Sequence, residues 1–266
     1  MKKLFKRILQ ITLLTFVTTI LTIVTIILFP QCLFANKLEY KNFKVYSNEK
    51  IGNDIKIILD NAIELVKKSE IYESNYRYNI VLCYNSFYNK LDSKLFGEGP
   101  TARSRLNDVI IKVRIEPKNN LAFPTFHKAC EQNLTCLLVH EMTHCLQSYK
   151  YGFLEFNLLK HPELWKVEGY PEYVARKAEL SKKGYSLTSQ IERYVNLESK
   201  ATDIWISGVD GGCEVPNYYY KGLLMIEYLI DIKHLSYGNI LNDTVSESTV
   251  YQEMINWKKS IYEVKD

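Results

Sequence analysis

The chain has 266 residues, of which 47% are apolar and 24% are charged. These values allow one sizeable core or two small lobes. The formal net charge is +4, and because 30 basic and 30 acidic residues balance after position 35, the excess comes from Lys2, Lys3, Lys6 and Arg7. A neutral body has no basic field for nucleic acid, so we expect no nucleic-acid partner.

The N-terminal segment, residues 1–35, predicts a membrane anchor. Residues 8–30, ILQITLLTFVTTILTIVTIILFP, carry no charge and are long enough to span a bilayer as a helix. A secretory signal usually has a shorter apolar stretch, so we expect an uncleaved anchor, with cleavage after Ala35 and secretion as the alternative. Because the basic cluster precedes the span, the body of the chain should be extracytoplasmic, held at the cell membrane by a single pass.

Residues 36–130 predict an α/β lobe. Apolar residues at helical spacing indicate a helix over 53–72, and GEGP indicates a turn over 97–100. Short apolar or β-branched runs indicate strands at 41–47, 78–85 and 107–117.

Residues 131–266 predict a helical lobe. The first helix should begin near Asn133 or Thr135 and end at Gly152. We expect helices at 133–150, 163–183, 187–198, 217–234 and 246–262. In this order of elements, strands and one helix come first and only helices follow. Such an order predicts an α+β fold, with a small mixed or antiparallel sheet in the N-terminal lobe and a mainly helical C-terminal lobe.

The chain has six cysteines, and Cys32 lies at the end of the apolar span. No CxxC pair occurs, which excludes a zinc knuckle built from cysteines alone. An extracytoplasmic body permits a short disulfide loop between Cys130 and Cys136. The alternative, which we favour, is buried free thiols.

The first helix of the helical lobe carries His140, Glu141 and His144 in the pattern HExxH. Positions 140 and 144 are one turn apart on one helix face, so the two imidazoles can converge on one metal ion. Glu141 lies at the edge of that face, where its carboxylate can reach a water at the metal without binding the metal. This pattern indicates a hydrolytic zinc site. The alternative is two partly buried histidines in a core helix.

The next helix carries Glu168, 24 positions after His144, and Glu172 one turn later. Glu168 can complete a site of two histidines and one carboxylate that leaves a fourth position open for water. Glu172 can hydrogen-bond the far nitrogen of a ligating histidine and determine its tautomer. The alternative is two solvated acids paired with basic residues at helical spacing.

HEMTH at 140–144 and WKVEGYPEY at 165–173 resemble the gluzincins, which are zinc metallopeptidases of the peptidase MA type. The resemblance covers residues 133–180 strongly and 214–231 weakly. It implies a zincin-like fold with the active-site helix between two lobes. It also implies one zinc ion per chain, ligated by His140, His144 and Glu168, with Glu172 supporting a ligating histidine.

EVPNYYYKG at 214–222 is similar to a segment that supplies a catalytic tyrosine in the aminopeptidase branch of the gluzincins. The resemblance implies this role for Tyr219, with Tyr218 and Tyr220 as alternatives. Aromatic packing at a helix start would explain the same cluster.

We therefore expect a zinc metallopeptidase in which Glu141 is the general base that activates water against a peptide or protein substrate. The chain lacks the Gly-x-Met-Glu-Asn strand by which the aminopeptidase branch grips a substrate amine, so an endopeptidase is favoured. The resemblance implies an edge strand over the zinc cleft that pairs with extended substrate, and residues 108–114 are the candidate. The alternative function is a non-catalytic, membrane-tethered domain whose zinc is structural or absent.

Overall fold

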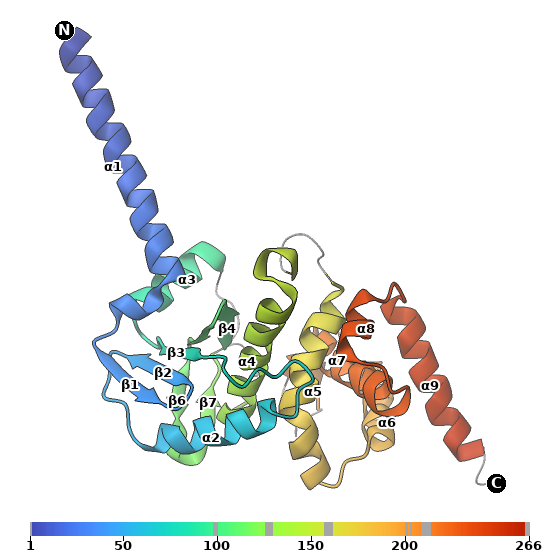
Figure 1. The fold of residues 1–266 in the computed structure, drawn as a ribbon. Helices are drawn as coiled ribbons and strands as arrows, with labels where there is room; N and C mark the ends of the chain where they lie inside the picture. The colour runs from blue at the N-terminus through green and yellow to red at the C-terminus, as the bar shows by residue number, and fades with distance from the viewer. Residues whose placement is uncertain are drawn as a thin grey trace.

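The computed structural model describes residues 2–97, 101–125, 130–156, 162–199, 202, 204–208 and 214–263. It confirms the α+β class, because the larger sheets precede residue 134 and long helices dominate after it. Figure 1 shows helix α4 (Leu134–Tyr151) between the strands and the other C-terminal helices. A long N-terminal helix projects away from the sheet (Figure 1).

That helix, α1, runs from Lys2 to Leu28, and its apolar stretch is not buried against the rest of the chain. Its length and its mean hydropathy of 2.5 suffice to cross a membrane. Five hydroxyl groups donate to the carbonyl oxygen four positions earlier, at 2.8–2.9 Å, on Thr15, Thr18, Thr19, Thr22 and Thr25. These bonds satisfy the threonines without water, as a helix in lipid requires.

The main sheet has five strands in the order β1-β2-β3-β5-β4. Strand β3 pairs in parallel with β2 and β5, whereas β1 and β4 lie antiparallel at the two edges. The strands are β1 (Asn36–Tyr40), β2 (Phe43–Ser47), β3 (Tyr78–Leu82), β4 (Ala102–Arg105) and β5 (Asp108–Ile111). The prediction of an edge strand at 108–114 is therefore wrong, because β5 lies between β3 and β4 and the chain then leaves this sheet.

The two faces of this sheet bury different clusters. Helix α2 (Asp54–Val66) provides the crossover that the parallel pair β2–β3 needs, and it packs with α4 on the larger core. Alternate residues such as Ile80 and Val109 face that core, whereas Val81 and Ile110 face a smaller cluster. Helix α3 (Phe87–Phe96), which the sequence analysis did not predict, covers the smaller cluster through Tyr88.

Two further sheets are small. One contains β6 (Arg114–Glu116), β7 (Leu121–Phe123) and β8 (Gln132–Asn133), and the other pairs β9 (Trp205–Ser207) with β10 (Glu214–Pro216). Two 3-10 turns, η1 and η2, lie at Pro30–Leu33 and Pro117–Asn119. Residues 98–100 of the predicted GEGP turn lie outside the described residues.

The C-terminal helices agree closely with the sequence pattern. The Asn133 side chain accepts a hydrogen bond from the backbone N–H of Cys136 at 3.0 Å, and Gly152 ends α4 with a φ of 81°. The helices after α4 are α5 (Leu164–Lys182), α6 (Leu187–Glu198), α7 (Asn217–Glu227), α8 (Tyr237–Asn242) and α9 (Glu247–Glu263). A π-helical turn, η4 (Tyr228–Ile232), follows α7 within the single helix predicted over 217–234.

Helices α5 and α7 cross at a contact between two glycines. A Cβ atom on Gly169 would lie 2.6 Å from the backbone carbon and oxygen of Gly222, well inside van der Waals distance. A side chain at position 169 would therefore push the two backbones apart. Because Glu168 precedes Gly169, and Tyr219 lies one turn before Gly222, this crossing also positions a candidate ligand beside a candidate catalytic residue.

Gly169→Ala is expected to separate α5 from α7 and to lower the free energy of unfolding by about 1–3 kcal/mol, the usual cost of overpacking. Gly238→Ala in α8 is the matched control, because its Cβ would meet only the Tyr151 hydroxyl, at 3.8 Å. That change should leave stability unchanged or raise it slightly. Thermal unfolding measures both variants, and equal melting temperatures would show that the crossing tolerates a side chain.

The short disulfide loop between Cys130 and Cys136, which the sequence permitted but did not favour, is not formed. Cys136 carries a free thiol that contacts the carbonyl oxygen of Ala175 at 3.4 Å and Glu179 Oε2 at 3.3 Å. Cys130 is bonded in a disulfide. The Cys130–Cys136 pairing is therefore wrong, and so is the interpretation of Cys130 as a free thiol. Buried free thiols are found at Cys83 and Cys145.

Candidate metal centre

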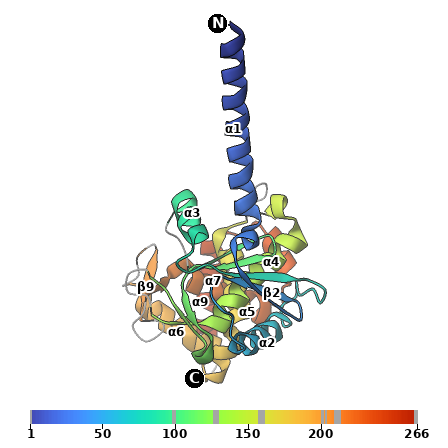
Figure 2. The same ribbon diagram turned by 90° about the vertical axis from the view of Figure 1, so that its left-hand side faces the viewer.

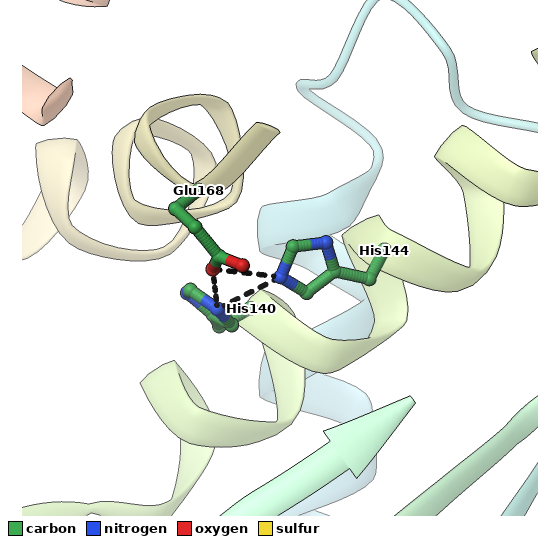
Figure 3. A group of neighbouring side chains, drawn as sticks. All are labelled: His140, His144 and Glu168. Atoms are coloured by element: carbon green, nitrogen blue, oxygen red, sulfur yellow. Dashed lines mark hydrogen bonds and ion pairs between the residues drawn. The ribbon is translucent and has the colours of Figure 1, made fainter. Parts of the chain in front are cut away.

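Figure 3 shows His140 and His144 on one face of α4, both directed at Glu168 of α5. The two Nε2 atoms are 3.0 Å apart. Glu168 Oε2 lies 3.1 Å from Nε2 of His144 and 3.3 Å from Nε2 of His140. Three donor atoms from two helices thus lie within 3.3 Å of one another. The sequence predicted this convergence from the HExxH pattern and from the position of Glu168.

This triangle has the dimensions of one face of a zinc tetrahedron. Zinc bonds of 2.0–2.1 Å at tetrahedral angles place neighbouring ligand atoms about 3.3 Å apart, and the observed separations are 3.0 to 3.3 Å. Two imidazoles and one carboxylate are also a donor set that zinc takes in catalytic sites. Within the described ranges no other group of three such donors is found. The residues present therefore fit one zinc ion.

The charges at this centre are strongly coupled. Burial alone would lower the pKa of His140, but Glu168 and Glu172 raise it to about 10. Burial alone would raise the pKa of Glu168, but the charge of His144 and hydrogen bonds from both imidazoles lower it. The carboxylates thus hold a positive charge at His140, and a zinc ion would supply that charge in place of a proton.

Glu172 lies where the sequence analysis placed it, at the far nitrogen of His140. Its Oε1 is 3.1 Å from His140 Nδ1, within ion-pair distance although poorly aligned for a hydrogen bond. Burial alone would raise the pKa of Glu172, but the paired Arg176 guanidinium and His140 lower it. An ionised Glu172 favours a proton on Nδ1, which leaves the Nε2 lone pair for a metal.

His144 has a partner that sequence reasoning missed. Its Nδ1 lies 2.7 Å from Oε1 of Gln147, a fully buried residue nearly one turn further along α4. Gln147 Nε2 donates to the carbonyl oxygen of Val167 at 2.9 Å and to the hydroxyl of Tyr237 at 2.6 Å. That hydroxyl donates in turn to the carbonyl oxygen of Lys166 at 3.1 Å.

These bonds determine the tautomer of His144. A carbonyl oxygen can only accept, so the amide NH₂ of Gln147 must face Val167 and its oxygen must face His144. His144 Nδ1 must then carry a hydrogen, so in the neutral imidazole Nε2 has the lone pair and can bind a metal between Glu168 and His140. The sequence held a weak signal, a polar residue three positions after a ligand. Its partners lie 20 and 90 positions away, so the role is visible only in the fold.

Glu141 is buried beside the ligands. Burial raises the pKa of its carboxyl group, and the charges of His140 and His144 oppose this rise. A raised pKa suits a group that exchanges protons with water near neutral pH. In the part of the chain that the structure describes, no hydrogen bond or ion pair to a side chain occupies this carboxylate.

The consecutive residues Tyr218, Tyr219 and Tyr220 differ in their distance from the metal centre. The ring of Tyr219 lies 5.2 Å from that of His140, and nearby carboxylates add to burial in raising the Tyr219 pKa. Tyr218 lies edge-on to Tyr219 at 4.7 Å. Tyr220 is buried, with its ring 5.9 Å from that of Tyr194. Tyr219 therefore lies beside the centre, Tyr218 is close enough for the Glu168 charge to add to burial in raising its pKa, and Tyr220 packs in the core.

One of the two edge strands of the main sheet, β4, also lies near the centre. Strand β4 contacts α4, and its Arg103 lies close enough to lower the pKa of Glu141. Among the described strands β4 pairs only with β5, so its outer edge offers free backbone groups to an extended peptide. Ala102–Arg105, and not residues 108–114, is therefore the edge strand that lies beside α4.

No family model matches the chain, and no match to it was found among curated proteins. The chemistry assigned to this centre therefore rests on its residues and their geometry.

Proposed function

We propose that the protein is a zinc metallopeptidase of the gluzincin type that cleaves peptide bonds within a polypeptide. The observation that carries this proposal is the triangle of donor atoms from His140, His144 and Glu168. Its dimensions suit zinc, and the three donors leave a fourth position for water. The buried Glu141 carboxylate beside that triangle supports a catalytic rather than a structural site.

Zinc bound at these three residues would supply Lewis acidity, polarising the substrate carbonyl and making the attacking water more acidic. Glu141 accepts the proton from that water and returns it to the leaving amine. The hydroxyl of Tyr219, or that of Tyr218, donates to the carbonyl oxygen as negative charge develops there. Glu172 and Gln147 hold the two histidines in the tautomer that leaves Nε2 free.

Strand β4 supports an endopeptidase. Its sequence, ARSR, contains two arginines and no acid that could bind a substrate amine. Its unpaired edge suits a peptide that continues on both sides of the cleaved bond. An aminopeptidase would need a carboxylate array here.

The location we propose is the outer side of a membrane, with α1 retained as the anchor. The length and hydropathy of α1 support a membrane span. The basic residues before the span support a cytoplasmic N-terminus. The disulfide at Cys130 supports an oxidising compartment for the folded body.

The full chain, purified in detergent, tests the proposed function. Its metal content is determined, and it is incubated with a mixed peptide library that is analysed by mass spectrometry. One equivalent of zinc together with cleavage inside peptides is the expected result. Zinc without cleavage would favour a non-catalytic zinc-binding domain. Absence of zinc from folded protein would contradict the proposal.

Gln147→Leu is expected to weaken zinc binding about 10–100-fold, the usual effect of removing the partner of a ligating histidine. The change removes the acceptor of His144 Nδ1–H and leaves buried partners without a donor. Gln147→Glu keeps an acceptor and should lose less affinity. Competition with a fluorescent zinc chelator measures all three proteins. Equal affinity of the leucine variant and the wild type would exclude a role of Gln147 in zinc binding.

A further inference from the structure

The end of α1 is built into the folded body without a flexible linker. The 3-10 turn η1 begins at Pro30, two residues after α1 ends. The ring of Phe34 lies 6.5 Å from that of Tyr88 in α3. Three residues from this region, Ile26, Leu33 and Phe34, pack on the smaller cluster formed by Val81, Cys83, Tyr88 and Ile110.

Arg105 at the end of β4 joins α1 to α3. Its Nη1 donates to the carbonyl oxygen of Ile27 at 2.7 Å and to the Tyr88 hydroxyl at 2.9 Å, and its Nη2 donates to Asp92 Oδ1 at 3.3 Å. Ile27 lies in the last turn of α1, where carbonyl groups lack helical partners and a cation is favourable. The Arg105 side chain is 12% exposed and that of Asp92 is 1% exposed, so water weakens these bonds little.

This rigid junction places the body directly at the surface of the membrane that α1 would span. Figure 1 and Figure 2 both show α3 beside the lower end of α1, on the side of the body from which α1 projects. The hydrogen bonds of Arg105 to Ile27 and Tyr88 agree with this view. Helix α3 is therefore close to the bilayer.

The exposed residues of α3 are apolar or basic. Phe87, Lys90 and Lys94 share the face opposite Tyr88 and Asp92. Leu95 and Phe96 lie at the last turn beside the buried side, where the Phe96 ring contacts Arg103 and Arg105. Tyr88 and Asp92 are buried, and Asp92 is the only acid of the helix. Phe87, Leu95 and Phe96 are exposed to 65%, 47% and 48%. Lys90 and Lys94 are exposed as well. Large apolar groups with lysines, and no exposed acid, are the composition of a helix that lies in a lipid interface.

We propose that α3 is a second membrane contact, in which the face formed by Phe87, Lys90 and Lys94 lies in the headgroup region of the bilayer that α1 spans. The lysines give this contact a preference for anionic lipid. The inference rests on the membrane anchoring of the proposed function and is independent of the peptidase activity. Two contacts prevent the body from tilting and hold the open edge of β4 at a constant orientation to the membrane.

Tryptophan fluorescence in vesicles tests this contact. Phe87→Trp places a fluorophore on the outward side of α3. Tyr185→Trp is the control, because Tyr185 is 41% exposed and belongs to the connection between α5 and α6. Figure 1 and Figure 2 show this connection at the end of the body away from α1. Both full-length variants are reconstituted in phosphatidylcholine–phosphatidylglycerol vesicles whose acyl chains are brominated near the headgroup. Wild-type protein provides the background of its three tryptophans.

Bromolipid is expected to quench the Phe87→Trp signal and to leave the Tyr185→Trp signal unchanged. Adding Lys90→Gln and Lys94→Gln to Phe87→Trp should reduce this quenching in phosphatidylglycerol-rich vesicles. Absence of quenching at position 87, in vesicles from which carbonate does not extract the chain, would overturn the inference. Extraction by carbonate would overturn the anchoring on which it rests. Cleavage of soluble peptides by the same detergent-purified protein reports separately on the peptidase proposal.

Discussion

Glu141→Gln is expected to keep one equivalent of zinc and to lower kcat for peptide cleavage by about 10²–10⁴-fold, the usual contribution of a general base. Zinc should remain because Glu141 is not among the three converging donors. Turnover should fall because a glutamine side chain has nearly the same shape but cannot accept and return a proton. Metal analysis and steady-state kinetics on one library-derived peptide measure the two effects separately.

Glu192→Gln is the matched control for this experiment, because Glu192 lies on α6 with its side chain 55% exposed. It should change neither zinc content nor kcat. Full activity of Glu141→Gln would exclude Glu141 as the base. Loss of zinc from that variant would instead show that Glu141 contributes to metal binding.

His144→Ala and Glu168→Ala are each expected to abolish stoichiometric zinc binding. Each removes one of three donors, so the loss should exceed the roughly 10–100-fold effect of removing a partner of a ligand. Zinc that binds the folded state raises its stability by mass action. A chelator should therefore lower the melting temperature of the wild type and leave that of both variants unchanged.

His234→Asn is the control, because His234 is exposed and its φ of 57° is one that asparagine tolerates. This variant should bind zinc as the wild type does. Wild-type zinc content in His144→Ala would show that the metal is held elsewhere. A chelator effect that persists in Glu168→Ala would exclude Glu168 as a ligand.

Local signals predicted the helices well. The pattern predicted 187–198, and α6 has these bounds; the cap at Asn133 and the stop at Gly152 of α4 are confirmed. Helical spacing and end signals are local, because each backbone bond joins residues four positions apart. The helix predicted over 53–72 is shorter, since α2 ends at Val66.

Strand order was not predictable in the same way. The run Val109-Ile110-Ile111 is apolar without alternation, as in a central strand with two covered faces, and this signal was present but missed. The polar sequence of β4 resembles a loop, because an edge strand faces solvent on one side. Which strand is at the edge depends on contacts between segments that are distant in the chain.

The sequence by itself determined that His140 and His144 lie one turn apart on the same helix face, with Glu141 at its edge. The helical repeat alone sets the positions of side chains four residues apart. The sequence also determined that Glu172 follows Glu168 by one turn. Only the tertiary structure decided that the Glu168 carboxylate lies 3.1 to 3.3 Å from both imidazoles. That distance depends on how α5 packs against α4 and α7, which the close approach of Gly169 to Gly222 permits. The roles of Gln147 at His144 and of β4 at the open edge likewise arise from contacts between distant segments, which no local pattern encodes.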